Sequence, residues 1–444
     1  MSSPAKQFDR RRGTILIVTM WIIMVLASLV LVLAQAMQVE LVASANDCSR
    51  LQAEAIEAGA IQYVLANVDS LQGQMPDPTV MACQTVHVGD GAFWIICPNY
   101  DDDTTMGYGL TDEAGKVNLN TASLAVLEML PDITEDMANS IIDWRSATGG
   151  AMNDYYMTQP DPYQCKKAPF ETVEELLLVY QASTDILFGS DTNRSGVQDA
   201  SEVGTIGPFD RGLFPFVTVY SAEPNTTTDG KARVNVNTAG ANLPLATLLA
   251  QRLGASRAMA IMQIVRRTPS FKNLFDFSYK AGLTNAEFAK LADRLKSTTA
   301  TSLRGMINVA TAPSLVLQCL PTLESSDADA LIALRENAST DLTNVAWVTQ
   351  ALTRAKAVAI GGLITSRTYQ FSADIVSVSK DGRAFRRCRI VVDARKSPPT
   401  VVYRKDMTGY GWPLDPGIIS GLRAGKSLDV VAPVTTTVSG GVGH

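Results

Sequence analysis

An uncharged apolar segment near the N-terminus is the feature that most constrains how this 444-residue chain can fold. It follows three consecutive arginines, Arg10 to Arg12, and residues 14–37 contain no charged side chain. As an α-helix the segment is long enough to cross a bilayer, because each residue adds about 1.5 Å. The basic residues predict a cytoplasmic N-terminus, with the rest of the chain on the other side of the membrane.

Three interpretations of this segment compete. Ala34 and Ala36 fit a signal-peptide cleavage site, but the apolar region is longer than the usual ~7–15 residues. A plain signal anchor is equally compatible with the hydropathy. The third interpretation is a prepilin leader, because Arg-Arg-Arg-Gly directly before a long apolar helix resembles the site of prepilin peptidase. Cleavage would then follow Gly13 and leave Thr14 as the new N-terminus.

The apolar helix is expected to continue beyond the membrane, as the stalk of a pilin-like protein does. Residues 51–68 are rich in alanine and carry apolar side chains at helical spacing. Most pilin-like proteins have a glutamate five residues after the cut, where this chain has Val18. A subunit without that acid is suited to the tip of a filament, where no further subunit follows.

A short motif occurs three times in the middle of the chain and predicts repeated helical hairpins. Its copies lie at 116–122, 233–239 and 306–312 and read KVNLNTA, RVNVNTA and MINVATA. The polar residues can cap an apolar helix, and a Leu-Pro pair ends that helix in the first and third copies. In these two copies a second helix ends with an arginine at the same offset, at Arg145 and Arg335.

Such hairpins resemble helix-hairpin-helix modules, also called SAM-like units, which in other families bind DNA. DNA-binding modules use a glycine-rich turn whose N–H groups approach a phosphate. The turns at 130–134 and 320–324 contain no glycine and have an acidic residue, and the net charge of the chain is −6. The hairpins are therefore interpreted as packing units without nucleic acid, and a membrane-tethered DNA-uptake protein is the alternative.

Residues 191–202, DTNRSGVQDASE, match the pattern of an EF-hand-type calcium loop. Oxygen-bearing side chains alternate along the first half of the loop, a glycine stands in sixth place for the sharp turn, and a glutamate closes the loop. An acidic surface turn is the competing interpretation. The predicted calcium ligands are Asp191, Asn193, Ser195, the carbonyl of Val197, Asp199 and Glu202. A second site near Asn153 and Asp154 is left open.

Cysteine and histidine usage limits the possible chemistry. Cys83 and Cys97 stand symmetrically about Asp90 in two strand-like runs, which predicts a hairpin disulfide if the compartment is oxidising. The pairing of the other four cysteines is open. The only histidines are His87 and His444, so a three-histidine zinc site is excluded and no nucleophile motif is present. The chain is not expected to be an enzyme.

The leader, Val18 and the asparagine-rich repeat together resemble the K-type minor pseudopilins of the bacterial type II (general) secretion pathway. The resemblance covers residues from about 10 to about 395. It implies a subunit at the pseudopilus tip that initiates or caps assembly for the export of folded proteins across the outer membrane. The implied partners are the major and other minor pseudopilins, prepilin peptidase, the inner membrane and secreted cargo; calcium is the implied ion. The implied location is the inner membrane, single-pass, with a periplasmic bulk.

The expected fold is α+β: a long pilin helix, a small antiparallel sheet and large inserted helical domains. Residues 368–379 and 384–394 alternate around a Lys-Asp-Gly-Arg turn and predict a β-hairpin. The expected segments are a leader (1–13), a transmembrane helix (14–37), the rest of the pilin helix with the first strands (38–112), a first helical domain with the calcium loop (113–215), a strand and second helical repeat (216–305), a third repeat and hairpin (306–395), and a largely flexible tail (396–444).

The N-terminus provides the first test. In cells that carry a prepilin peptidase, intact mass and N-terminal sequencing of the membrane-purified protein should give Thr14 as the first residue. A start at Met37 or an uncut Met1 would contradict the prepilin interpretation and indicate an ordinary exported or anchored protein.

Overall fold

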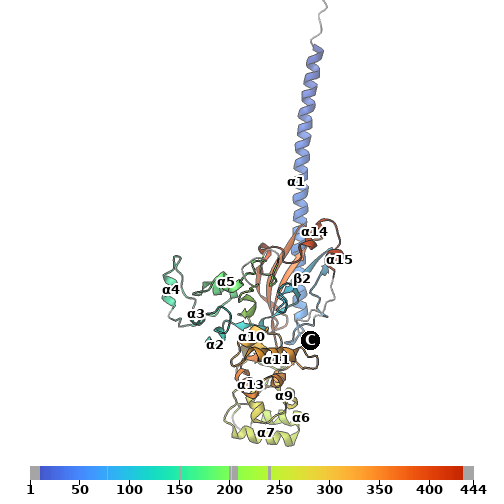
Figure 1. Cartoon of the computed structure of the whole chain (residues 1–444). Coiled ribbons are helices and arrows are strands. Elements are labelled where there is room, and N and C mark those ends of the chain that lie inside the picture. Colours follow the sequence, from blue (N-terminus) through green and yellow to red (C-terminus); the bar gives the residue numbers. More distant parts are fainter. Residues whose placement is uncertain are drawn as a thin grey trace, which may run out of the picture.

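The computed structural model describes residues 11–77, 79–150, 152–199, 202, 209–238 and 242–433 (Figure 1). It combines one long helix, an antiparallel sheet and groups of short helices, which confirms the predicted α+β class. The side chains of residues 11–13 lie outside the described part, as do residues 1–10 and 434–444.

Helix α1, Arg11–Val68, is continuous from the apolar segment into the folded body. Its apolar first part extends alone, away from the rest of the chain (Figure 1), and is exposed on all sides. From Thr14 onward α1 is long and apolar enough to cross a membrane. Its last part buries Ile56, Ala60 and Val64, which lie four residues apart and therefore share one helix face. This face packs against the sheet.

The main sheet is antiparallel throughout, with the central order β1-β2-β13-β14-β15. Its hairpin β13/β14 pairs Val378 with Phe385, as the alternating sequence predicts. One face packs on α1, and the other packs on helices near the C-terminus. The strands are β1 Val86–Val88, β2 Gly91–Cys97, β3 Gly107–Tyr108, β4 Thr111–Asp112, β13 Gln370–Val378, β14 Phe385–Asp393 and β15 Thr400–Asp406.

The segment after residue 396 differs from the expected flexible tail. It adds the edge strand β15 and then η5 Thr408–Tyr410, α14 Pro416–Arg423 and α15 Leu428–Val431. Ile418 and Leu422 of α14 are buried against the sheet face that contains Trp94. The segment is ordered up to residue 433 because it covers apolar side chains that would otherwise face water.

The helical part is inserted between β4 and β13, which are paired neighbours in the sheet. It consists of three units, and each is closed by a two-residue parallel strand pair that starts in the repeated motif. Val117–Asn118 pairs with Val217–Thr218, Val234–Asn235 with Leu295–Lys296, and Ile307–Asn308 with Ile364–Thr365. The repeat in the sequence is therefore a repeat in the structure.

The first unit contains η1 Glu113–Gly115, α2 Leu124–Leu127, α3 Glu135–Arg145, α4 Asn153–Met157, η2 Val173–Leu178, α5 Thr184–Phe188, η3 Phe214–Phe216 and the closing pair β5/β6. The second contains α6 Leu243–Leu253, α7 Ala255–Arg267, α8 Leu274–Lys280, α9 Asn285–Ala292 and β8/β9. The third contains α10 Ser314–Gln318, α11 Ser325–Arg335, η4 Val345–Trp347, α12 Val348–Ala351, α13 Arg354–Ile360 and β11/β12.

The first and third units share one hydrophobic core, whereas the second has a core of its own. A ribbon of two short strands, β7 Ala222–Pro224 and β10 Ser302–Arg304, leads into and out of the second unit. Phe275 and Phe288 of the second unit extend into the shared core and dock the unit there. Helices α6 and α7 of this unit lie at the end of the molecule opposite the free part of α1 (Figure 1).

The asparagines of the repeat are clamps rather than simple helix caps. The side-chain amide of Asn120 donates to the Phe170 carbonyl (3.0 Å), and its oxygen accepts from the Phe170 N–H (2.7 Å). Asn237 makes the same pair of bonds with Phe271, at 3.0 and 2.8 Å. Each clamp fixes the entry of the chain segment that follows the hairpin. The third copy has Ala310 at this position and lacks the side chain for such a clamp.

The arginines at matching offset also act on the repeated motif. Arg145 donates to the carbonyl of Ala122 (2.5 Å), and Arg335 donates to the carbonyl of Ala312 (2.6 Å). Ala122 and Ala312 are the last residues of their copies of the motif. The end of the second helix is thereby fixed to the start of the first, which accounts for the shared spacing.

The asparagine clamp can be tested with Asn120→Ala. The substitution leaves the N–H and C=O of Phe170 without their side-chain partner, so the free energy of unfolding should fall by about 2–4 kcal/mol. Urea unfolding of the full chain in detergent measures this change. Asn139→Ala is the control, because Asn139 is exposed and bonds only to its own helix turn. Equal losses in both variants would contradict the clamp.

Candidate functional site

The loop at 191–202 brings its predicted ligands together between α5 and η3. Asp191, Ser195 and Glu202 are buried, with exposed fractions of 6%, 5% and 2%. Polar side chains are rarely this buried unless they are hydrogen-bonded or hold an ion. Residues 200–201 and 203–208 lie outside the described part, so the loop is followed through residues 191–199 and 202.

The first half of the loop is wrapped around the Asp191 carboxylate. Its oxygens accept from the N–H groups of Ser195 (2.9 Å) and Gly196 (2.8 Å). The Asn193 side-chain oxygen also accepts from the Ser195 N–H, at 2.8 Å. Gly196 has φ +77°, and a Cβ there would lie 2.9 Å from the Cγ of Pro98. Only glycine therefore fits this turn, as the calcium-loop pattern requires.

The second half of the loop folds back so that its last residue closes it. One Glu202 carboxylate oxygen accepts from the Thr192 N–H (2.8 Å), and the other accepts from the Asp199 N–H (3.2 Å). The Asn193 amide donates to the Asp199 carboxylate at 2.5 Å. The predicted ligands at positions 1, 3, 9 and 12 are thus joined in one hydrogen-bonded loop.

The loop concentrates negative charge in a buried place. Burial raises the pKa of Asp191, and the nearby charge of Glu202 raises it further, although the Gly196 and Ser195 N–H groups oppose the shift. A cation bound between these carboxylates would attract both of them and so offset their mutual repulsion. Within the described residues no three Asp, Glu, His or Cys side chains form a ready metal cluster. A bound ion would therefore also need amide, hydroxyl and carbonyl oxygens, a set that suits calcium.

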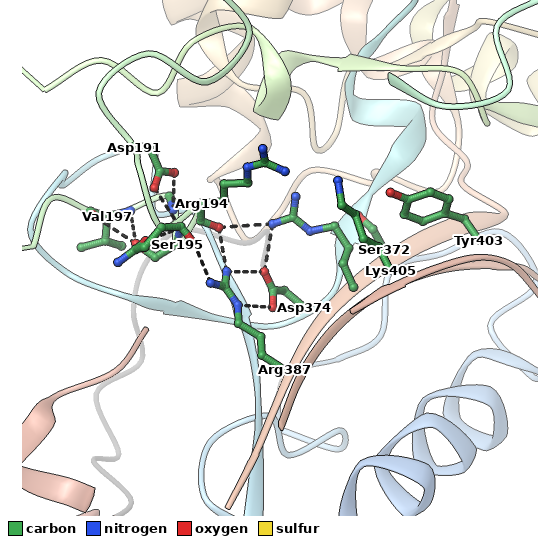
Figure 2. Close-up of polar contacts among 12 residues, drawn as sticks. Asp191, Arg194, Ser195, Val197, Ser372, Asp374, Arg387, Tyr403 and Lys405 are labelled. Atoms are coloured by element: carbon green, nitrogen blue, oxygen red, sulfur yellow. Dashed lines mark hydrogen bonds and ion pairs between the residues drawn. The ribbon is translucent and has the colours of Figure 1, made fainter. Parts of the chain in front are cut away.

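A fully buried arginine of the sheet holds the loop from below (Figure 2). Arg387 on β14 is 0% exposed and makes two bonds to the carboxylate of Asp374 on β13, at 3.0 and 2.7 Å. Its other N–H groups donate to the main-chain carbonyls of Asn193 and Arg194, both at 2.7 Å. Arg389 donates to the same carboxylate at 2.9 Å. We call Asp374, Arg387 and Arg389 the sheet clamp.

The charges of Arg387 and Arg389 set the direction of the pKa shift at Asp374. Burial alone would raise the pKa of Asp374, but the guanidinium groups of Arg387 and Arg389 outweigh burial and lower it. One carboxylate faces two arginines, so the clamp carries net positive charge. The carbonyls of Asn193 and Arg194 supply the remaining acceptors, which are needed because unpaired buried donors are costly.

Arg211 provides a second anchor on the other side of the loop. It donates to the Gly196 carbonyl (2.8 Å) and pairs with Asp103 (2.8 Å). The Gln198 N–H donates to the Asp103 carbonyl at 2.7 Å. The sequence analysis did not identify Arg211 or the sheet clamp as parts of the site. The signal for the clamp was a single aspartate within the apolar strand β13, opposite a strand, β14, that contains three arginines.

The expected disulfide between Cys83 and Cys97 stays a prediction, although the hairpin register differs from the symmetric one. The hairpin turn contains two residues, so Val88 pairs with Gly91 and the register is shifted by one residue from the symmetric arrangement. Thr85 has φ +48°, which interrupts the strand before Cys83 is reached. Burial raises the pKa of both thiols to about 12, and the charge of Cys83 adds to the shift at Cys97, so the two groups lie close enough to influence each other.

The other expected site residues are placed as follows. Gly13 and Thr14 lie within α1. Asp154 is exposed, and the side chain of Asn153 lies outside the described part, so the second metal site stays open. In the hairpin turns of the first and third units, Asp132 (φ +57°) and Thr322 (φ +70°) adopt the left-handed conformation that favours glycine.

Comparisons with known proteins give a family match and a structural similarity. The family described as helix-hairpin-helix motif matches residues 112–153, which lie in the first helical unit. A solved structure with similarity is a chain of the GspK-GspI-GspJ complex from the type 2 secretion system of enterotoxigenic Escherichia coli. The identity is 12% and the TM-score 0.41, and the match covers 80% of this chain and 96% of that chain. No curated protein matches this sequence.

Proposed function

We propose that this chain is a minor pseudopilin at the tip of the type II secretion pseudopilus, where it initiates or caps assembly for the export of folded proteins. The observation that carries the proposal is α1. Its first part is apolar and exposed on every side, and the same helix continues without a break into a face packed on an antiparallel sheet. A helix of this kind can lie in the membrane and later pack with the helices of neighbouring subunits.

The inserted helical units support the tip position. They leave the sheet between β4 and β13 without interrupting it; the first unit lies beside the sheet, and the third and second lie beyond it, away from the free part of α1 (Figure 1). A further subunit stacked above this chain would meet that bulk. Val18 agrees with such a position, because a terminal subunit needs no acid for a following one.

The proposed role implies a location, a processing enzyme and partners for the chain. The chain would be a single-pass protein of the bacterial inner membrane with its bulk in the periplasm, processed by prepilin peptidase. Its partners would be the other minor pseudopilins, the major pseudopilin and secreted cargo. Its work would be assembly, and we expect no catalytic turnover.

We further propose that the loop holds one calcium ion. Asp191, Asn193, Ser195, Asp199 and Glu202 would provide side-chain oxygens, and Val197 its carbonyl. The ion would offset the repulsion between the buried Asp191 and Glu202 carboxylates and order a loop whose ordering otherwise costs conformational entropy.

A DNA-binding protein built on helical hairpins is the second candidate, and the helix-hairpin-helix match at 112–153 favours it. The hairpin within that match argues against it, because Asp132 occupies the left-handed turn position. A carboxylate there would face the phosphate that such a turn approaches.

Site-specific photocrosslinking in secreting cells tests the tip position. A crosslinker replacing Val39, which is 71% exposed on α1, should capture other minor pseudopilins, because helices pack side by side in the filament. A crosslinker replacing Met259, which is 64% exposed on α7, should capture none of them. Pseudopilin adducts at Met259 would place a subunit above this chain. No adducts at Val39, together with salt-dependent binding of DNA, would favour the alternative.

Thermal unfolding with and without calcium tests the loop. At a calcium concentration about 100 times Kd, binding should stabilise the full chain by about 2.7 kcal/mol and raise Tm. EDTA should remove the gain. Glu202→Gln should abolish most of the response, whereas Glu128→Gln, at an exposed position, should keep it. An equal response in the two variants, or none in the wild type, would contradict the calcium proposal.

A further inference from the structure

The second helical unit differs from the rest of the chain in its charge. Residues 225–301 contain eleven Lys and Arg against four Asp and Glu, a formal charge of +7. The whole chain carries −6, so the remaining residues carry −13. A strongly basic unit with its own core therefore projects from an acidic body.

Internal ion pairs use only part of this positive charge. Each of the four acids pairs with a basic residue of the same unit: Asp229 with Lys231, Asp276 with Lys280, Glu287 with Arg257, and Asp293 with Arg233. Seven basic residues have no ion-pair partner in the described part of the chain. Five of them are exposed: Arg252, Arg266, Arg267, Lys272 and Lys290; the half-buried ones are Arg294 and Lys296.

A groove on this unit is lined by both apolar and basic side chains. Its lining includes the apolar Val234, Leu243 and Leu248 and the basic Lys231 and Arg294. Leu243, the first residue of α6, is 72% exposed and lies in the groove with other apolar side chains, where a partner could cover it.

We propose that this groove docks an acidic segment of a partner protein, with an apolar side chain of that segment seated on Leu243. Arg294, which has no ion-pair partner in the described residues, would contact an acidic side chain of the segment, and Lys231 would contact another by exchanging its pairing with Asp229. The exposed arginines and lysines would draw the partner to this unit, and the negative charge of the rest of the chain would repel it from other faces. The inference goes beyond the assembly role and does not depend on the calcium loop.

The shape and place of the unit favour a protein over other polyanions. A phosphate backbone gains nothing from apolar lining residues, whereas a protein segment can bury an apolar anchor against them. The unit also lies at the end of the molecule opposite the free part of α1 (Figure 1), so the bilayer that holds α1 is remote from it.

Selection from a random 12-residue peptide phage library tests the proposal, with the full-length protein in nanodiscs as bait. Peptides that combine Asp or Glu with a large apolar residue should be enriched. Their binding should weaken as salt is raised, since charge contributes to the attraction. Enrichment of neutral or basic peptides, or no enrichment, would overturn the proposal.

Variants then locate the binding site of the selected peptide. Leu243→Ser should weaken its Kd about tenfold or more, because the apolar anchor loses its contact. The double variant Arg266→Gln and Arg267→Gln should slow association and flatten the salt dependence. Lys396→Glu with Lys426→Glu, two exposed sites outside the unit, is the control and should leave Kd unchanged.

A competing polyanion is the remaining outcome. If a 30-base-pair DNA duplex binds more tightly than the selected peptides and Leu243→Ser leaves that binding unchanged, the basic unit is a nucleic-acid surface and the proposal is wrong. If both the Leu243→Ser and control variants weaken peptide binding equally, the groove is not the site.

Discussion

The contact between the sheet clamp and the loop joins the two halves of this molecule. Arg387 is fully buried, and Asp374 cannot satisfy all of its donors while also accepting from Arg389. The missing acceptors come from the loop of the first helical unit, through the carbonyls of Asn193 and Arg194. Without that unit two donors of Arg387 would lose their acceptors, and Asp374 alone would balance two guanidinium groups, which is costly wherever these groups stay buried. The donors of Arg387 are therefore fully paired only when the helical part is docked on the sheet.

The sheet is assembled from strands that lie far apart in the sequence. Strands β1 to β4 precede the insertion and β13 to β15 follow it, so the pairing of Phe371 with Asp112 must close a very long stretch of chain. Loop-closure entropy opposes such pairing. Compact units with their own parallel strand pairs shorten the distance, because each brings its two ends together. The asparagine clamps act within the first two units, which can therefore become ordered before the sheet closes.

Short local patterns in the sequence were sufficient to predict some of these features. The three copies of the motif, the β13/β14 hairpin and the loop at 191–202 were recognisable because capping residues, alternation and ligand spacing are short-range signals. The clamp formed by Asp374 and Arg387 was missed because its partners on the loop lie almost 200 residues away. The hairpin around Asp90 was misjudged by one residue, since a two-residue and a three-residue turn look alike in sequence. The ordered segment after 396 was missed because its order depends on a sheet face that only the folded chain presents.

The ribbon that carries the second unit has a consequence for how such a protein can diversify. Pro224 and Ser302 lie opposite each other, so the chain departs and returns at adjacent points. Everything between them forms a cassette that can be shortened, enlarged or exchanged while the path of the remaining backbone is preserved, provided that the face containing Phe275 and Phe288 is matched. Related chains can thus share one anchor and one sheet and yet differ at the outermost end, where each cassette would confer its own binding preference.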